Sequence, residues 1–379
     1  MRRRVLMVGR TRYRLPLDAG LARKFDALDE YLHLRVLASP VPGGVTRPDP
    51  RFVLLPTVRP AALDGAAFYT ALAPATAREI RRFRPHAIVA ESPQMGAIAL
   101  GARRLAGRPA PAVITEVHGD WRTSTRLYGS PLRRLGSPLG DRLGARGVRD
   151  ADAVRAISPY TAALVEATRG RPADAVFPTF SDLGAFADRP PAPLPTRPTA
   201  LFVGVLERTK NLDGLVAAWP GVVRAVPEAR LVVVGSGSLA PQVQELARAF
   251  PGGVEHHEEL PQPEVARRMD ESTVLCLPSR FEGLGRVVIE SYARGRGVVV
   301  AARGGLLDLV DDEVEGLLVD PDESGALSAA LARVLADPAL ARRLGEAARR
   351  RYAAWHSTPE EFARRLAELV DVGVANRRP

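Results

Sequence analysis

TVLCLPSRFEGLGRVVIESYARGRGVVVAA, residues 273–302, contains a complete strand–turn–helix–strand unit. The runs TVLCLP and GVVVAA are short, unbroken and apolar, which is typical of strands buried on both faces of a parallel sheet. Between them, SRFEGLG provides a glycine-rich turn, and RVVIESYARG has the length and composition of a helix. The stretch therefore predicts a βαβ crossover, the repeating unit of parallel α/β sheets.

Two glutamates in this stretch lie where a carboxylate needs a partner. Glu282 falls in the turn that follows the first strand, beside Gly283 and Gly285, which open the backbone so that N–H groups can face a ligand. Glu290 lies inside the apolar helix, where an unpaired carboxylate is costly to bury. Because open α/β sheets bind ligands beyond the carboxyl ends of their strands, we interpret the pair as acceptors for a polyhydroxylated ligand. Two accidental surface glutamates are the alternative.

Similar apolar runs alternate with helical patterns along the whole chain. In the first half we expect strands at 5–8, 34–38, 52–56, 87–91, 112–115 and 153–157. In the second half we expect them at 199–204, 230–235, 273–278, 297–302 and 316–320. The alternation predicts an α/β fold of two doubly wound parallel sheets.

The proline-rich segment 188–200 has neither a helical nor a strand period, and it predicts a stiff linker between the two sheets. We therefore expect one domain at 1–190 and a second domain at 191–355. The remaining stretch, 356–379, begins with a helix-capping pattern at Thr358. It predicts a C-terminal helix that packs back on the first domain.

The bulk composition is that of a globular protein with real cores, since 46% of its 379 residues are hydrophobic and 25% are charged. No apolar run approaches the roughly 18 residues that span a bilayer, and the first residues predict a strand rather than a signal peptide. The single cysteine, Cys276, excludes an intramolecular disulfide and a cysteine-rich zinc site. We therefore expect a cytoplasmic protein.

The positive charge is concentrated in the first half of the chain. Residues 1–196 hold 30 Lys and Arg against 17 Asp and Glu, a net of +13, and residues 197–379 hold 23 against 26, a net of −3. A basic surface favours anionic partners, among them lipid headgroups and lipid-linked phosphates; a merely solubilising surface is the alternative. The charge is therefore compatible with an anionic or membrane-borne partner and with a peripheral position at the inner face of the membrane.

Two further turns of the second half suggest a nucleotide. Arg208 and Lys210 lie between a strand and a helix start, and cations beside free helix N–H groups suit a phosphate. An ordinary basic loop is the alternative. Gly235 and Gly237 in GSGSLA match a dinucleotide fingerprint, with Glu255 twenty residues beyond. The motif lies on the second strand of its domain, so it favours close nucleotide approach more than NAD.

One histidine of the first half is placed at a strand end. The strand AVIT runs into TEVHGDW, which puts His118 where ligands of α/β sheets bind. A purely structural histidine is the equal alternative.

The second half resembles glycosyltransferase family 4, whose members are retaining, sugar-nucleotide-dependent enzymes of the GT-B fold, with two Rossmann-like domains facing across a cleft. The resemblance rests on VGVLERTKN, LVVVGSGSL, PSRFEGLGRVVIESYARG, GVVVAARGGLLDLV and VEGLLVDPDE, and it covers about 199–321. In the first half it rests on TEVHGD, AVRAISPYTAALV and the first strand. The two spaced glutamates followed by Gly304–Gly305 form its most specific part.

The resemblance implies roles for the candidate residues. Glu282 contacts the transferred sugar, His118 reaches that sugar from the first domain, and Lys210 binds the phosphate. Glu290 binds the nucleotide ribose. Arg208 and the backbone of Gly283, Leu284 and Gly285 are expected at the sugar and diphosphate.

Three positions depart from the family pattern. Val205 stands where many members have arginine, and Arg208 is expected to substitute. Asp308 stands where glutamate is frequent. Only Gly20 follows the first strand where many members have a glycine pair, which affects the expected diphosphate contact of the first domain.

The resemblance implies a retaining hexosyltransferase that moves a sugar from a nucleotide-diphosphate donor to an acceptor hydroxyl of a lipid-linked, polysaccharide or glycoconjugate acceptor. It also implies that residues 1–190 bind the acceptor and residues 191–355 bind the donor, and the basic first half then suggests an anionic or membrane-borne acceptor. We expect neither a metal nor a cofactor, because protein cations can stabilise the leaving diphosphate. No nucleic-acid partner is expected, and the oligomeric state is not indicated. A sugar-nucleotide epimerase of the same fold, an NAD-dependent oxidoreductase and a non-catalytic sugar-nucleotide binder are the alternatives.

Overall fold

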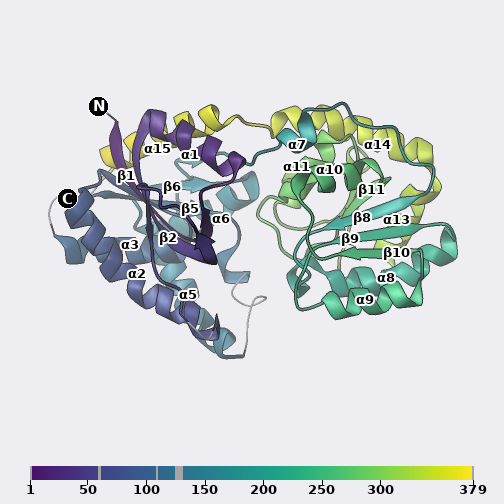
Figure 1. Ribbon diagram of the computed structural model, residues 1–379, viewed down its shortest axis with the longest axis horizontal. Helices are drawn as coiled ribbons and strands as arrows, with labels where there is room; N and C mark the ends of the chain where they lie inside the picture. Colours follow the sequence, from purple (N-terminus) through teal and green to yellow (C-terminus); the bar gives the residue numbers. More distant parts are fainter. Residues whose placement is uncertain (1, 59–60, 108–109, 124–130, 378–379) are drawn as a thin grey trace. The chain divides into compact units, whose positions relative to one another are not determined.

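The computed structural model describes residues 2–58, 61–107, 110–123 and 131–377. The chain divides into two compact units (Figure 1). Unit 1 comprises residues 1–181 and 357–379, and unit 2 comprises residues 182–356. Each unit has its own sheet and its own hydrophobic core.

Unit 1 contains a parallel sheet in the order β3-β2-β1-β4-β5-β6-β7. Its strands are β1 (Arg3–Leu15), β2 (Leu32–Val45), β3 (Phe52–Leu54), β4 (Ala87–Ala90), β5 (Ala112–Val117), β6 (Ala153–Ala156) and β7 (Ala175–Val176). The chain grows outward from β1 in one direction and then, from β4, in the other. The carboxyl ends of β1 and β4 therefore border the topological switch point, where doubly wound folds bind ligands.

Helices cover both faces of this sheet: α1 (Ala19–Tyr31), α2 (Ala61–Phe83), α3 (Pro93–Ala106), α5 (Pro131–Arg149), α6 (Pro159–Arg169) and α15 (Pro359–Ala375). Successive side chains of β1 enter opposite cores, with Val5 and Met7 in one and Leu6 and Val8 in the other. This arrangement explains why the run VLMV carries no polar residue, since a strand covered on both faces has no solvent side.

Unit 2 repeats the design with the order β10-β9-β8-β11-β12-β13. Its strands are β8 (Thr199–Val203), β9 (Arg230–Val234), β10 (Val254–His257), β11 (Val274–Leu277), β12 (Gly297–Ala301) and β13 (Gly316–Val319). Its helices are α7 (Gly184–Ala187), η1 (Arg208–Lys210), α8 (Leu212–Ala225), α9 (Ala240–Ala249), α10 (Gln262–Asp270), α11 (Arg286–Ala293), α12 (Leu306–Leu309), α13 (Ala326–Ala336), α14 (Pro338–Arg351) and η2 (Tyr352–Ala354). The switch point lies between β8 and β11.

The predicted fold class of two doubly wound α/β sheets is confirmed, and every predicted strand is present. Two strands were not predicted. β10 has the sequence VEHH with one buried residue, and β7 has two residues, so neither shows an apolar run. β1 also continues to Leu15, through part of the segment that was expected to form the first strand–helix turn.

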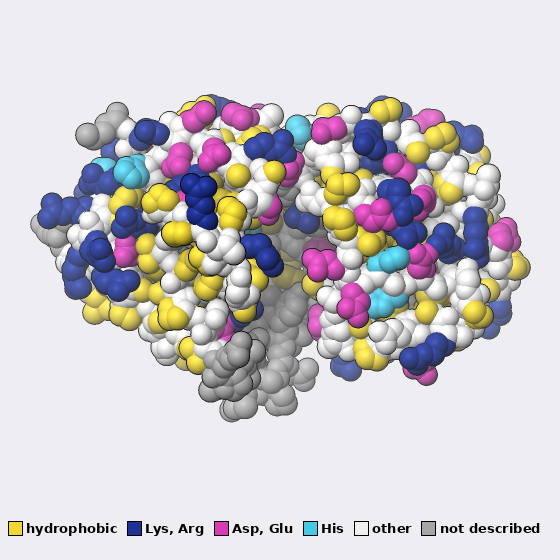
Figure 2. Space-filling view, viewed as in Figure 1, with side chains coloured by type: hydrophobic (Ala, Val, Ile, Leu, Met, Phe, Trp, Pro, Cys, Tyr) yellow, Lys and Arg dark blue, Asp and Glu magenta, His cyan; other side chains and the backbone are white. Residues whose placement is uncertain are grey.

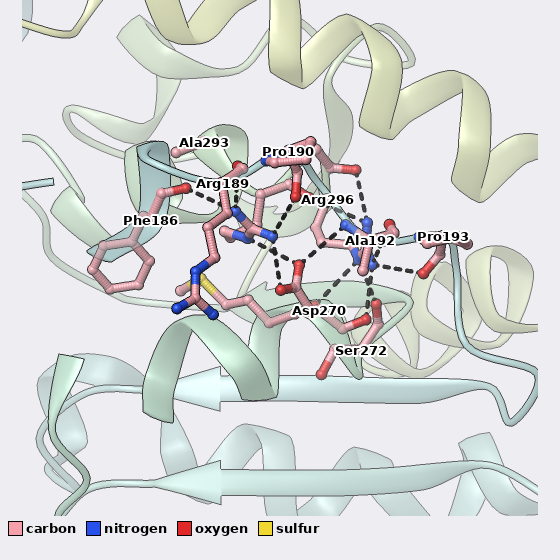
Figure 3. Close-up of polar contacts among 12 residues, drawn as sticks. Phe186, Arg189, Pro190, Ala192, Pro193, Asp270, Ser272, Ala293 and Arg296 are labelled. Carbon is pink, nitrogen blue, oxygen red and sulfur yellow. Dashed lines mark hydrogen bonds and ion pairs between the residues drawn. The ribbon is translucent and has the colours of Figure 1, made fainter. Parts of the chain in front are cut away.

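The proline-rich segment 188–200 was expected to be a stiff linker between the two sheets, but it lies within unit 2 and is hydrogen-bonded to it (Figure 3). Two buried arginines at the end of α11, Arg294 and Arg296, donate hydrogen bonds to its backbone carbonyls. The accepting carbonyls there include those of Arg189, Pro190, Ala192 and Pro193, at 2.8–3.0 Å.

Asp270 completes this clamp by accepting from Arg294 at 2.7 and 2.9 Å. Guanidinium groups have five N–H donors, which suits a proline-rich segment outside the sheet whose backbone carbonyls need hydrogen-bond partners. The division between the units therefore falls between residues 181 and 182, before the predicted boundary at 190, and again between residues 356 and 357.

The C-terminal helix α15 packs on α1 within unit 1 (Figure 1). Thr358 caps its amino end by accepting from the backbone N–H of Glu361 at 3.1 Å. Phe362 is 2% exposed, and its ring meets Phe177 edge-on with a centroid separation of 5.9 Å. The helix thus contributes directly to the core of unit 1.

Phe362→Ala is expected to lower the free energy of unfolding of unit 1 by about 3–5 kcal/mol, because it removes a buried ring and leaves a cavity. Calorimetric unfolding measures the effect. Val372→Ala, on the same helix at a position 41% exposed, is the matched control and should change stability by less than about 0.5 kcal/mol. Equal losses in both variants would contradict the packing of α15 described above.

Candidate active site

The predicted donor residues lie in loops that follow neighbouring strands of unit 2. Lys210 ends η1, which follows β8, and Glu282 follows β11. β8 and β11 pair directly, so their carboxyl ends border the switch point from opposite sides. The fold thus brings together two residues 72 positions apart in the sequence.

Lys210 and Glu282 form an ion pair at this edge of the sheet. The Lys210 side chain is 19% exposed and that of Glu282 is 12% exposed. Ser279 also donates its hydroxyl hydrogen to Glu282 Oε1 over 3.0 Å. The pair is therefore neutral as a whole, partly desolvated, and reachable by a ligand that carries both an anionic group and hydroxyls.

The loop that carries Lys210 is fixed by Arg280, on the loop of β11. Arg280 donates to the backbone carbonyl of Arg208 at 2.9 Å and pairs with Asp213 at 2.8 Å. Arg280 N–H also donates to the carbonyl of Thr209 at 2.9 Å. Arg208 itself has an exposed side chain at this turn.

Gly304 and Gly305, in the loop after β12, pack against the backbone of the Glu282 turn. Gly305 N–H donates to the carbonyl of Glu282 at 3.0 Å. A Cβ on Gly304 would lie 2.5 Å from that carbonyl oxygen, and one on Gly305 would lie 2.1 Å from the carbonyl oxygen of Gly283. The glycine pair is thus required for close backbone packing, and it holds the turn that presents Glu282.

α11 begins immediately after this turn. Gly285 is its N-cap residue, in the left-handed region with φ of 80°, and no side chain caps the helix there. Leu284 is partly buried against the core of unit 2. The positive end of the helix dipole, near a lysine, is a favourable location for an anion.

Glu290 lies on α11 and is 4% exposed. Its Oε1 pairs with Arg286 Nε at 2.9 Å, one helical turn earlier. Burial raises the pKa of the Glu290 carboxyl, and the Arg286 guanidinium opposes that rise. The predicted need for a partner is met by an arginine whose own side chain is 61% exposed.

Gly235 and Gly237, after β9, are required for packing against the β8 loop. A Cβ on Gly235 would lie 1.9 Å from the carbonyl oxygen of Gly204, and one on Gly237 would lie 2.5 Å from that of Leu206. Glu207 accepts from the N–H of Ser238 at 2.9 Å and from its hydroxyl at 2.6 Å. Glu207 thus binds the N–H and hydroxyl of Ser238, two donors that could otherwise bind a phosphate.

His118 lies in unit 1, directly after β5. Its Nε2 is 3.1 Å from Glu116 Oε2, and its side chain is 39% exposed. Glu116 is buried and also pairs with the fully buried Arg155, on the adjacent strand β6, at 2.9 Å. His118 therefore lies at the carboxyl edge of the sheet of unit 1.

The described residues contain no group of three or more His, Cys, Asp or Glu side chains that could hold a metal ion. One Asp-x-Asp sequence follows β13, at Asp320 and Asp322. Arg303 lies against both carboxylates, at 3.6 Å from Asp320 Oδ1. None of the described helices is long and apolar enough to cross a membrane.

Several residues of the site had not been predicted from the sequence. Glu207 and Arg280 are ordinary loop residues whose partners lie in loops that follow other strands. Ser279 is an ordinary loop residue whose partner, Glu282, lies in the same loop. Arg155 lies inside the predicted strand 153–157, and Glu116 directly follows the predicted strand 112–115, within the longer observed β5. A charged residue in an otherwise apolar buried strand was the available signal, because such a charge needs a partner.

Two family models match the chain. Residues 18–179 match the glycosyl transferase 4-like domain, and residues 186–351 match glycosyl transferases group 1. The chain belongs to glycosyltransferase family 4, with the GT-B fold.

Among curated proteins, a GDP-mannose-dependent alpha-(1-6)-phosphatidylinositol monomannoside mannosyltransferase of Mycolicibacterium smegmatis is 29% identical over 65% of this chain. A D-inositol 3-phosphate glycosyltransferase of Segniliparus rotundus is 36% identical over 40% of this chain. The matches span 66% and 35% of those two proteins' own lengths.

Solved structures share the fold of this glycosyltransferase. Sucrose-phosphate synthase from Thermosynechococcus elongatus has a TM-score of 0.77 at 22% identity, covering 97% of this chain and 98% of its own. HepE of Anabaena in complex with UDP has a TM-score of 0.68 at 16% identity, covering 98% and 100%.

The raised pKa of Glu290 predicts a pH-dependent stability. A carboxyl with a raised pKa holds its proton more tightly in the folded chain, so the folded state loses stability as the pH rises from 4.5, the ordinary value, through the raised pKa. Glu290→Gln removes this loss. Urea unfolding should show similar stabilities for variant and wild type near pH 5 and a more stable variant at pH 8.

The exposed Glu346→Gln on α14 is the control, and its difference from wild type should stay within about 0.5 kcal/mol at every pH. A Glu290→Gln variant less stable than wild type at pH 8 would show that Arg286 compensates fully for burial.

Proposed function

We propose that this glycosyltransferase is a retaining hexosyltransferase that uses a nucleotide-diphosphate sugar. The Lys210–Glu282 pair at the switch point of unit 2 is the observation on which this proposal rests. An ammonium complements a phosphate, and a carboxylate accepts hydrogen bonds from sugar hydroxyls. A sugar diphosphate carries phosphates and hydroxyls. Its phosphate can replace Glu282 as the partner of Lys210, and its hydroxyls can replace Lys210 as the partner of Glu282.

The chemistry proposed for these residues is stabilisation of the departing diphosphate. As the bond between the anomeric carbon and the phosphate oxygen breaks, charge develops on that oxygen, and Lys210 and the amino end of α11 stabilise it. The acceptor oxygen bonds to the same face of the anomeric carbon, and its proton passes to the leaving phosphate. No metal, cofactor or protein nucleophile is part of the proposal.

The remaining candidates have supporting roles in this proposal. Glu290 binds the ribose, Arg208 provides a second cation at the diphosphate, and the Gly283–Gly285 turn donates N–H groups. Gly235 and Gly237 keep the β9 loop close to the β8 loop, which allows the nucleotide to lie near the backbone. His118 contacts the transferred sugar.

The names of similar proteins suggest the donor and acceptor classes. One similar protein is named for GDP-mannose and phosphatidylinositol monomannoside, and a second is named for inositol 3-phosphate. A third, similar in structure, was solved in complex with UDP. An anionic acceptor agrees with the net charge of +13 over residues 1–196, which is 30 minus 17. On the face drawn in Figure 2, Lys and Arg side chains gather at several places on unit 1. We propose a lipid-linked or otherwise anionic acceptor.

Lys210→Met should weaken every nucleotide-diphosphate sugar roughly 10–100-fold, the range expected when a charged hydrogen bond is lost. Glu282→Gln should instead reduce discrimination between sugars on one nucleotide. A thermal-shift titration with UDP-, GDP- and ADP-sugars measures both effects. Arg333→Met, which removes an exposed pair with Glu313 in the same unit, is the control.

If both site variants bind and turn over donor like the control, the site is wrong. Protection by NAD without protection by any nucleotide-diphosphate sugar would favour the oxidoreductase alternative. Epimer formed from donor alone, without acceptor, would favour the epimerase.

The acceptor proposal predicts binding to anionic vesicles. Cosedimentation with phosphatidylglycerol vesicles should be strong at low salt and should fall as the salt concentration rises, because exposed charges are screened. Phosphatidylcholine vesicles are the control and should bind little. Absence of salt-sensitive binding to the anionic vesicles would remove the membrane-borne acceptor from the proposal.

A further inference from the structure

A buried chain of charged contacts ends at His118. Glu116, the next-to-last residue of β5, is 3% exposed, and its two oxygens face different partners. Oε1 pairs with Arg155 Nη2 at 2.9 Å, and Oε2 is 3.1 Å from His118 Nε2. Glu116 therefore connects a fully buried cation to a partly exposed imidazole.

Arg155 is held more firmly than an ordinary ion-pair partner. It is 0% exposed, and it donates to the carbonyls of Phe177 and Pro178 at 3.3 Å and to Thr179 Oγ1 at 2.9 Å. Its guanidinium also lies 4.7 Å from the ring centroid of Phe177 and 5.4 Å from that of Phe362. These several contacts hold the Arg155 guanidinium in place, and Glu116 Oε1 pairs with that guanidinium.

Burial alone would raise the pKa of Glu116, but Arg155 and His118 lower it to about 2. The carboxyl is therefore ionised at every physiological pH and can only accept hydrogen bonds. The nitrogen that faces it, Nε2, must carry a hydrogen. In the neutral imidazole, the other nitrogen, Nδ1, is then the acceptor.

We propose that Glu116 and Arg155 are positioning residues for His118, which fix its ring as the Nε2–H tautomer and leave Nδ1 to accept a hydrogen bond from a hydroxyl of the transferred sugar. The part that concerns the sugar rests on the proposed function. The part that concerns the tautomer rests only on contacts within unit 1.

The same contacts would also suit a purely structural ion pair, so the test needs a matched control. Glu79 on α2 provides one, because it is 2% exposed and pairs with Arg35 at 2.9 Å in the same unit. Glu79→Gln removes a carboxylate as buried as that of Glu116, on a helix that does not carry His118. A structural effect should appear in both variants, whereas positioning of His118 should depend on Glu116 alone.

The tautomer is measured by two-bond ¹H–¹⁵N correlation spectra of the ¹⁵N-histidine-labelled full chain at pH 8, with His118→Asn identifying the His118 signals. Wild type and Glu79→Gln should show a protonated Nε2 and an unprotonated Nδ1. Glu116→Gln should give a mixture, because a carboxamide can accept or donate. A wild-type ring protonated at Nδ1, or an unchanged spectrum in Glu116→Gln, would overturn the proposal.

Kinetics test the link to sugar transfer. Glu116→Gln should lower kcat roughly 10–100-fold. Metal-binding sites lose affinity or activity by a similar factor when the residue that accepts the ring N–H of a ligating histidine is removed. In a His118→Ala background, Glu116→Gln should leave kcat almost unchanged, because Glu116 acts through His118. Equal losses in both backgrounds would show that Glu116 does not act through His118.

Glu116→Gln leaves Arg155 buried without its charged partner, and the variant could fail to fold. Arg155→Met combined with Glu116→Gln removes both charges, and it should show the same mixed tautomer. If His118→Ala leaves transfer unchanged while the spectra behave as expected, the sugar contact is overturned and the tautomer assignment stands. The two failures are therefore distinguishable.

Discussion

The direct pairing of β8 with β11 is the constraint on which the candidate donor site depends. Lys210 and Glu282 can meet only because the chain reverses its direction of growth between these strands, which leaves their loops on opposite sides of one gap. The contact requires both loops to be fixed at their bases. Arg280 fixes the first through backbone carbonyls, and the Gly304–Gly305 backbone fixes the second.

Most of the fold could be predicted because strands covered on both faces contain almost no polar residues. Runs such as VLMV and VVVG are unambiguous for that reason. β10 escaped prediction because its VEHH sequence is mostly half-buried and lies at the edge of its sheet. The proline-rich segment was misinterpreted for a different reason, since the two arginines that hold it, Arg294 and Arg296, follow it by about a hundred residues.

The candidate site shows the same division between local and non-local information. Lys210 and Glu282 were predicted as site residues because each follows a strand, which is a local property. Glu207 and Arg280 were not predicted, because their contacts are with loops that follow other strands. Ser279 was missed although its contact with Glu282 lies within one loop. The glycines of GSGSLA were attributed to a ligand alone, whereas they are required by the carbonyls of Gly204 and Leu206. A sequence pattern cannot separate these two uses of glycine.

Each unit carries a cation–carboxylate pair at the carboxyl edges of neighbouring strands, and the two pairs differ in burial. Glu116 and Arg155 have side chains 4% and 0% exposed, whereas Glu282 and Lys210 are 12% and 19% exposed. Separating a fully buried pair leaves uncompensated charges and costs several kcal/mol, roughly 3–5 when one partner is removed. A partly solvated pair can exchange its partners for ligand groups at lower cost. The difference in burial therefore favours a fixed pair in unit 1, as proposed for the orientation of His118, and an exchangeable pair in unit 2, as proposed for the binding of a sugar diphosphate.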